Sequence, residues 1–244
     1  MLKNIILSFL TSILLNLPAA MATELMTEVG GAWQHRNDVK IKPESGTYFE
    51  FNELDKGPFP HYRIELFQAF GKKSFIRLVY APFTVKITGK PKFAINFNDK
   101  IFIPNRDLTI NYSFNSYRAT YIYRLWDNSK NYFEVGFTGK VRQADIQFTQ
   151  DNTTSMYDNI GFVPLFYMGT QFMLASKLFF YSNFDFAVAS QGQAFDLALK
   201  LRYTLFDPFN MGLGIRSLEG GADNEKVFTW SWFNYAVLDF SLQF

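Results

Sequence analysis

The chain has 244 residues, contains no cysteine, and carries 24 Lys and Arg against 22 Asp and Glu. The length allows one sizeable domain. The lack of cysteine excludes disulfides, thiolate chemistry and cysteine-ligated metals, and the near-neutral charge gives no indication of nucleic-acid binding. Aromatic residues make up 19% of the chain, yet the mean hydropathy is −0.06. This combination excludes disorder and predicts alternation, in which each apolar residue stands beside a polar one.

The first 22 residues have the pattern of a secretory signal peptide. Lys3 is their only charge, an apolar run covers residues 5–17, and Ala20-Met21-Ala22 supplies small residues for cleavage. The run is shorter than the ~20 residues that a spanning helix needs, which disfavours a membrane anchor. We therefore expect cleavage after Ala22 and a mature chain that starts at Thr23.

Apolar and polar residues alternate along most of the remaining chain, as they do in β-strands. In residues 195–203, aromatic and leucine side chains share one face while Asp196, Lys200 and Arg202 share the other. No helical period follows the signal peptide. Ten strands are predicted, over residues 46–54, 59–71, 73–88, 107–126, 131–149, 159–174, 177–189, 194–206, 210–219 and 227–244.

The connections between these strands alternate between tight turns and longer, more varied loops. The tight turns are residues 71–73, 127–130, 175–177 and 207–210, and the loops are residues 54–57, 89–107, 150–159, 190–193 and 220–226. An even strand count with this asymmetry is the layout of a bacterial outer-membrane barrel. A soluble barrel or sandwich would also alternate, but several strands exceed the ~9–11 residues that cross a bilayer. The sequence thus predicts an all-β fold, a single antiparallel transmembrane β-barrel over residues 46–244.

The chain ends on VLDFSLQF, Val237–Phe244, with apolar residues at alternate positions. This ending resembles the recognition signal of outer-membrane barrel proteins, which makes Phe244 the expected assembly signal for the barrel-assembly machinery. The segments FNSYRATYIYR (Phe114–Arg124) and IRSLEGGAD (Ile215–Asp223) are similar to segments of a group of uncharacterised outer-membrane barrel proteins of proteobacteria. The resemblance covers about residues 46–244. It implies a Gram-negative outer membrane, with its lipids and lipopolysaccharide as surroundings, and supplies no activity.

Two regions depart from the regular pattern. Residues 23–45 are mixed and polar, and they are expected to plug the periplasmic mouth, to line the lumen or to pair as an extra strand. An extra pair of strands would make the barrel twelve-stranded. The polar positions change phase within Asn111–Arg118 and again near Arg142-Gln143. A one-residue slip of this kind predicts a β-bulge.

Charged residues on the inward face should form a lumen charge network. Because a barrel of about ten strands is only slightly wider than an eight-stranded one, whose side chains fill the interior, we expect these charges to brace one another in a largely plugged lumen. A small anion-preferring channel is the alternative, because rings of Arg and Lys favour anions. The predicted network comprises Arg63, Glu65, Arg77, Arg118, Arg124, Glu134, Lys140, Arg142, Asp185, Asp196, Lys200, Arg202, Arg216 and Asp239.

An outer-membrane enzyme that modifies lipid A or phospholipid is the third interpretation. Acyl transfer by a hydroxyl nucleophile usually needs a His base, and His61, at the expected outer end of the second strand, is a weak catalytic candidate. A lone histidine at a rim is more often an ordinary polar residue. No motif predicts a cofactor or a metal site, and the oligomeric state is not indicated.

Overall fold

The structure, a computed structural model, describes residues 23–244 apart from residues 43, 129 and 191. The expected signal peptide lies outside the described residues. Almost all of the described chain is extended, and it forms long antiparallel strands. No helix in this part of the chain is long and apolar enough to cross a membrane.

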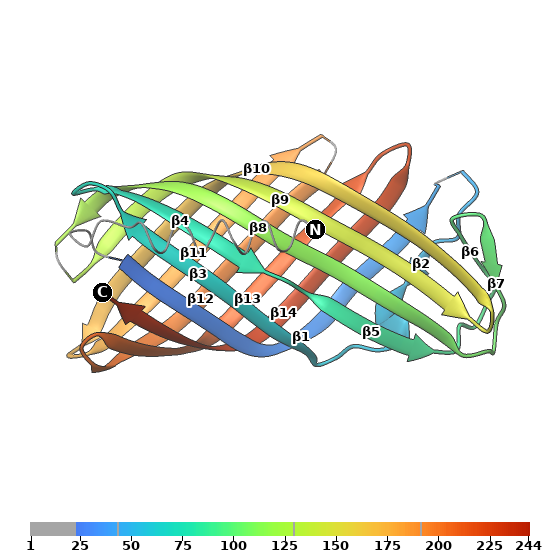
Figure 1. The fold of residues 1–244 in the computed structure, drawn as a ribbon, viewed down its shortest axis with the longest axis horizontal. Coiled ribbons are helices and arrows are strands. Elements are labelled where there is room, and N and C mark those ends of the chain that lie inside the picture. Colours follow the sequence, from blue (N-terminus) through green and yellow to red (C-terminus); the bar gives the residue numbers. More distant parts are fainter. Residues whose placement is uncertain (1–22, 43, 129, 191) are drawn as a thin grey trace.

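Ten long strand positions form one closed antiparallel barrel (Figure 1), as the alternation predicts. We call these positions staves, and β4 and β5 together make up one of them. Each stave pairs with the next, and β14 pairs with β1, so the sheet closes on itself. Thr23 and Phe244 exchange backbone hydrogen bonds of 2.9 Å at this seam. The staves are β1 (Thr23–Ile41), β3 (Phe59–Ala69), β4 (Ser74–Ala81) continued by β5 (Thr84–Gly89), β8 (Leu108–Asp127), β9 (Tyr132–Gln150), β10 (Thr153–Ala175), β11 (Leu178–Ala189), β12 (Gly192–Phe206), β13 (Phe209–Asp223) and β14 (Val227–Gln243).

The first stave is not the predicted one. β1 pairs with β14 on one side and with β3 on the other, so residues 23–41 are part of the barrel wall. The predicted strand at 46–54 contains only the short β2 (Phe49–Glu50) and the 3-10 turn η1 (Phe51–Glu53). The barrel wall therefore begins at Thr23 and not at residue 46, and of the three roles expected for residues 23–45 the structure shows pairing as a strand. Glycines and inward-facing carboxylates in β1 obscure its apolar outward face in the sequence.

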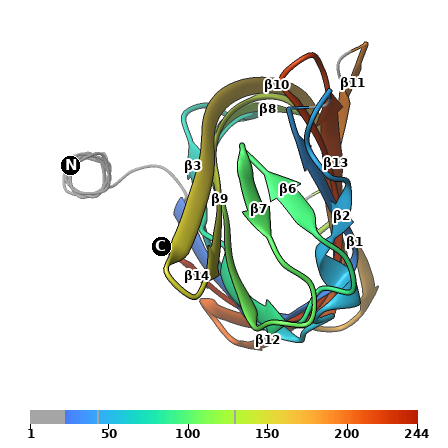
Figure 2. The same cartoon turned by 90° about the vertical axis from the view of Figure 1, so that its right-hand side faces the viewer.

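The two ends of the barrel differ in their connections. At the turn end, tight turns join the strands, and Thr23 and Phe244 lie there (left in Figure 1). At the loop end, residues 44–58 and 90–107 cover the opening. The second segment carries the hairpin of β6 (Ile95–Phe97) and β7 (Lys100–Phe102), which is seen in the opening in Figure 2. The predicted loop at 150–159 is largely strand, because β9 and β10 continue to a short turn at residues 151–152.

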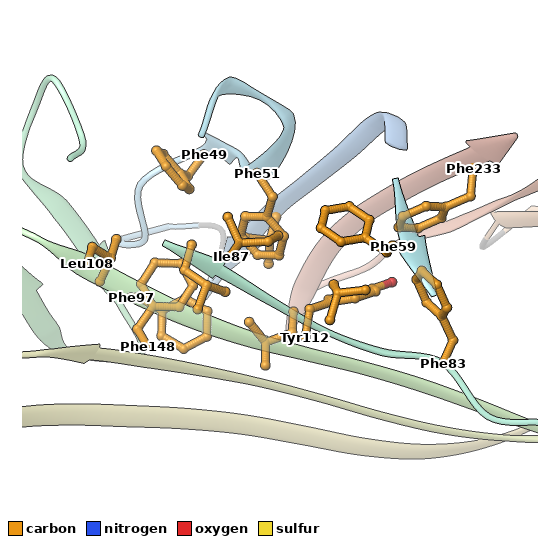
Figure 3. Close-up of a cluster of buried hydrophobic side chains, with 14 of the residues drawn as sticks. Phe49, Phe51, Phe59, Phe83, Ile87, Phe97, Leu108, Tyr112, Phe148 and Phe233 are labelled. Atoms are coloured by element: carbon orange, nitrogen blue, oxygen red, sulfur yellow. The ribbon is translucent and has the colours of Figure 1, made fainter. Parts of the chain in front are cut away.

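A hydrophobic core fills the loop-end half of the lumen (Figure 3). Phe148 of β9 is fully buried, and its ring stacks on Phe97 of β6 with centroids 4.1 Å apart. Phe49 and Phe51, carried inward by β2 and η1, approach the same ring at 6.2 and 5.9 Å. The loop segments thus plug this half of the barrel with aromatic side chains.

β8 and β9 change polarity halfway along without a change of register. Their pairing runs unbroken from Thr109↔Thr149 to Arg124↔Glu134. The inward residues are apolar near the loop end, as at Ile110, and charged near the turn end, as at Arg118. The bulges predicted in these two places are therefore wrong. The same side of each strand faces inward throughout, and the material inside the barrel changes from a hydrophobic core to ion pairs.

The outer wall also changes polarity along the barrel, most clearly on β9. Around the turn-end half it is apolar: Phe137, Leu201 and Leu213 are 65%, 50% and 68% exposed. Beside the hydrophobic core, the outward residues of β9 are instead polar: Gln143, Asp145, Gln147 and Thr149. An apolar outer band is what a transmembrane barrel presents to lipid. The band indicates that the turn-end half is the embedded part and that the loop-end half projects beyond it.

This polarity makes a prediction about topology. Cysteines introduced at Asn152 or Asp223, both at the loop end, should react with an impermeant maleimide on intact cells, whereas one at Asn128, at the turn end, should react only after lysis. The natural chain has no cysteine, so the background is clean. Labelling of the Asn128 variant alone on intact cells would invert the assignment.

Candidate functional site

Buried ion pairs fill the turn-end half of the lumen. Every stave except β10 contributes a charged member, and β10 contributes Tyr167. We call this set the lumen network. Its charged members are Glu24, Glu28, Arg63, Glu65, Arg77, Arg118, Arg124, Glu134, Asp185, Asp196, Lys200, Arg202, Arg216 and Asp239.

Asp196 of β12 is a central carboxylate of the network. Its oxygens lie 2.5 Å from Nη1 of Arg216, 2.6 Å from Nη2 of Arg118 and 3.1 Å from Nη1 of Arg63. The residue is only 4% exposed. One carboxylate therefore joins strands β3, β8, β12 and β13 in a site largely closed to bulk water.

Asp185 of β11 holds the neighbouring position. It accepts hydrogen bonds from Nη2 of Arg77 at 2.6 Å, from Nη1 of Arg118 at 2.8 Å and from the Thr138 hydroxyl at 2.7 Å. Because Arg118 also contacts Asp196, the two carboxylates share one guanidinium. The contacts of Arg77 and Arg118 with Asp185 cross the lumen from β4 and β8 to β11.

Glu28 of β1 is a network centre that the sequence analysis missed. Its carboxylate lies 2.8 Å from Nε of Arg216, 2.5 Å from Nζ of Lys200 and 2.9 Å from Nε2 of His61. Glu24 on the same face lies 3.5 Å from Nη1 of Arg202. Neither glutamate is among the predicted network members, because the expected barrel wall begins only at residue 46. The period-two spacing of Glu24, Met26 and Glu28 was the signal that could have found them.

Tyrosines complete the network near the turn end. The guanidinium of Arg202 lies 3.6 Å from the ring centre of Tyr181 and 3.3 Å from Asp239. On the adjacent strand β10, the Tyr167 hydroxyl donates to Glu134 of β9 at 3.0 Å, and Arg124 contacts the same carboxylate at 3.2 Å. These aromatic rings pack around the charged groups at this level of the barrel.

Two predicted network members do not join it. Within the described residues, neither Lys140 nor Arg142 lies within ion-pair distance of a carboxylate, although both project inward from β9. Nη2 of Arg142 instead donates to the side-chain oxygen of Asn159. These two cations lie between the lumen network and the hydrophobic core.

His61 does not lie at an open rim. It is 8% exposed, bonds Glu28, and packs against the ring of Tyr235 at 4.7 Å beneath the aromatic core. Among the described residues no serine or threonine hydroxyl bonds its ring, so the arrangement of nucleophile and base that acyl transfer requires does not form here. His61 lies at the loop-end start of β3, as expected, but it is not at an open rim because β1 continues beyond it to Ile41 and the aromatic core covers it.

The lumen network is suited to holding walls together. Arg63 of β3 reaches Asp196 of β12, and Arg77 of β4 reaches Asp185 of β11. Each carboxylate of the network contacts at least one Arg or Lys. Removing one member of a buried pair typically costs ~3–5 kcal/mol, because the other charge is left without compensation. In the described part of the chain, no group of three or more His, Asp or Glu residues is placed to hold a metal ion.

Comparison with solved structures places the fold. The chain is similar to the outer membrane protease OmpT from Escherichia coli, with a TM-score of 0.60 and 5% identity over 93% of this chain and 99% of that one. The fold is that of an outer-membrane β-barrel. Ail of Yersinia pestis is a more distant match, with a TM-score of 0.39 and 11% identity over 89% of this chain and 98% of that one. No family model matches the sequence, and neither does any curated protein.

Proposed function

We propose that this protein is an integral outer-membrane barrel with a closed lumen, in which ion pairs and aromatic packing hold the walls together. The carrying observation is the set of ion pairs that cross the lumen, above all those of Asp196 and Asp185. On this proposal the mature chain assembles through the barrel-assembly machinery, with Phe244 as its signal. Outer-membrane lipids and lipopolysaccharide surround its apolar band.

The distribution of charge favours a brace over an anion channel. A pore selective for anions needs cations that are free to meet the passing ion. Here Arg63, Arg77, Arg118 and Arg216 are each bound to carboxylates and at most 5% exposed. The core around Phe148 fills the other half of the path. An ion would have to break several charge-assisted contacts and then cross an apolar plug.

Conductance tests the proposal directly. The purified, refolded protein should insert into planar bilayers without producing discrete current steps, because both halves of the lumen are filled. Insertion should be verified independently by protease protection of the embedded strands. A stable, anion-selective conductance from correctly folded wild-type protein would contradict the closed lumen and support the channel.

A lipid profile tests the enzymatic alternative in the same strains. Cells with and without the protein should yield the same lipid A and phospholipid mass spectra. A mass change that depends on the protein and is abolished by His61→Gln would replace the structural function with a catalytic one.

A further inference from the structure

Lys140 and Arg142 are inward-facing cations that form no ion pair with any carboxylate of the described residues. Lys140 is 4% exposed, and among the described residues no carboxylate lies within 4.0 Å of it. Its ammonium lies over the ring of Phe114, with Nζ 5.0 Å from the ring centre. Across the strand pair stands Arg118, another cation, whose guanidinium is already bound to Asp185 and Asp196.

Arg142 has the same deficit. It follows Lys140 on the same face of β9, and its Nε is buried without a hydrogen-bond partner in the described chain. On the neighbouring strand it is paired with Gly161, where a Cβ atom would lie 3.4 Å from Nη2 of Arg142. At this position β10 has no side chain facing the guanidinium. The unpaired Nε donor and the unpaired ammonium thus belong to successive inward positions of β9, below the hydrophobic core.

Burying charge without a partner is costly, and proteins either pair such a group or neutralise it. The carboxylates of the lumen network cannot help, because each already contacts Arg or Lys. We propose that Lys140 and Arg142 together bind one small inorganic anion of about the size of chloride, held between the Lys140 ammonium and Nε of Arg142. This site is separate from the lumen network, and it adds ligand binding to the structural role proposed above.

The pairing of β10 gives the anion a way in. The loop-end part of β10, Thr153–Leu165, pairs only with β9, since pairing with β11 starts at Phe166↔Phe186. In Figure 1 the β11–β12 hairpin ends well before β10 does. Asn159 and Gly161 lie in this unflanked part, and Arg142 behind them is half-buried. The lumen network continues toward the turn end, so the anion would enter and leave on the same side.

Bromide locates the site directly in wild-type protein. Crystals grown in sodium gluconate and soaked in sodium bromide should show an anomalous peak within contact distance of Lys140 Nζ and Arg142 Nε. Absence of a peak there, with bromide found only on the outer surface or nowhere, would overturn the proposal and leave Lys140 as an uncharged amine. This measurement needs no variant to fold.

Thermal unfolding gives a second readout in solution. At constant ionic strength, each tenfold rise of chloride replacing gluconate above the dissociation constant should raise the Tm of the wild type by about 3–6 °C. Lys140→Met should abolish this dependence without lowering the Tm in gluconate. Lys86→Met, which removes an exposed outward lysine of β5, should retain it. Equal chloride dependence in the wild type and Lys140→Met would show that the effect arises elsewhere.

Discussion

Replacing Asp196 with Asn should lower the free energy of unfolding by about 3 kcal/mol. The carboxylate contacts Arg63, Arg118 and Arg216, and the neutral amide would leave three buried guanidinium groups short of negative charge. Loss of one partner of a buried pair costs ~3–5 kcal/mol. The lower end applies because each of the three arginines keeps a second carboxylate, as Arg118 keeps Asp185. Urea unfolding in lipid vesicles measures the change.

Asp158→Asn is the matched control for that experiment. Asp158 is an exposed carboxylate on β10, and the same chemical change there should alter the free energy of unfolding by less than ~0.5 kcal/mol. If the two variants unfold alike, the lumen contacts of Asp196 carry no stability and the brace is refuted. High salt separates them further, since buried pairs are screened less than exposed ones.

Truncating Phe148 to Ala should cost about 3–5 kcal/mol, the range for a large side chain lost from a packed core. Its ring is fully buried and contacts four other rings, which come from four loop-end elements. These are Phe49 of β2, Phe51 of η1, Phe97 of β6 and Phe102 of β7. We expect the loss to loosen the loop-end half before the barrel unfolds. Hydrogen exchange of residues 95–102 should rise, while exchange in the turn-end strands should stay slow.

Phe137→Ala on the same strand is the control. Phe137 is 65% exposed on the outer wall, so its truncation removes lipid contact without opening a cavity, and residues 95–102 should remain protected. Equal exchange of the β6–β7 hairpin in both variants would show that the hairpin does not depend on the Phe148 cluster.

The sequence alone predicts the barrel because the governing signals are local. Alternation of apolar and polar residues along a segment such as 195–203 is a period-two property of the strand itself, and tight turns such as residues 207–210 mark where a strand must reverse. The inward placement of Asp196, Lys200 and Arg202 follows from the same alternation. Nine of the ten staves could be placed in this way, with ends that shift by several residues where β10 and β13 continue into the expected loops.

The tertiary structure alone decided which charges meet. Glu28 bonds Arg216 across 188 positions of sequence, and no local pattern specifies that pairing. The same holds for the phase changes in β8 and β9. The same phase change in a sequence can arise from a β-bulge or from a change in what surrounds the two faces of a regular strand. Here the surroundings change: lipid outside and ion pairs inside give way to a polar exterior and an aromatic core. Residue periodicity fixes the two faces of a strand, but which face meets lipid, charge or core depends on the closed barrel and the loops folded into it.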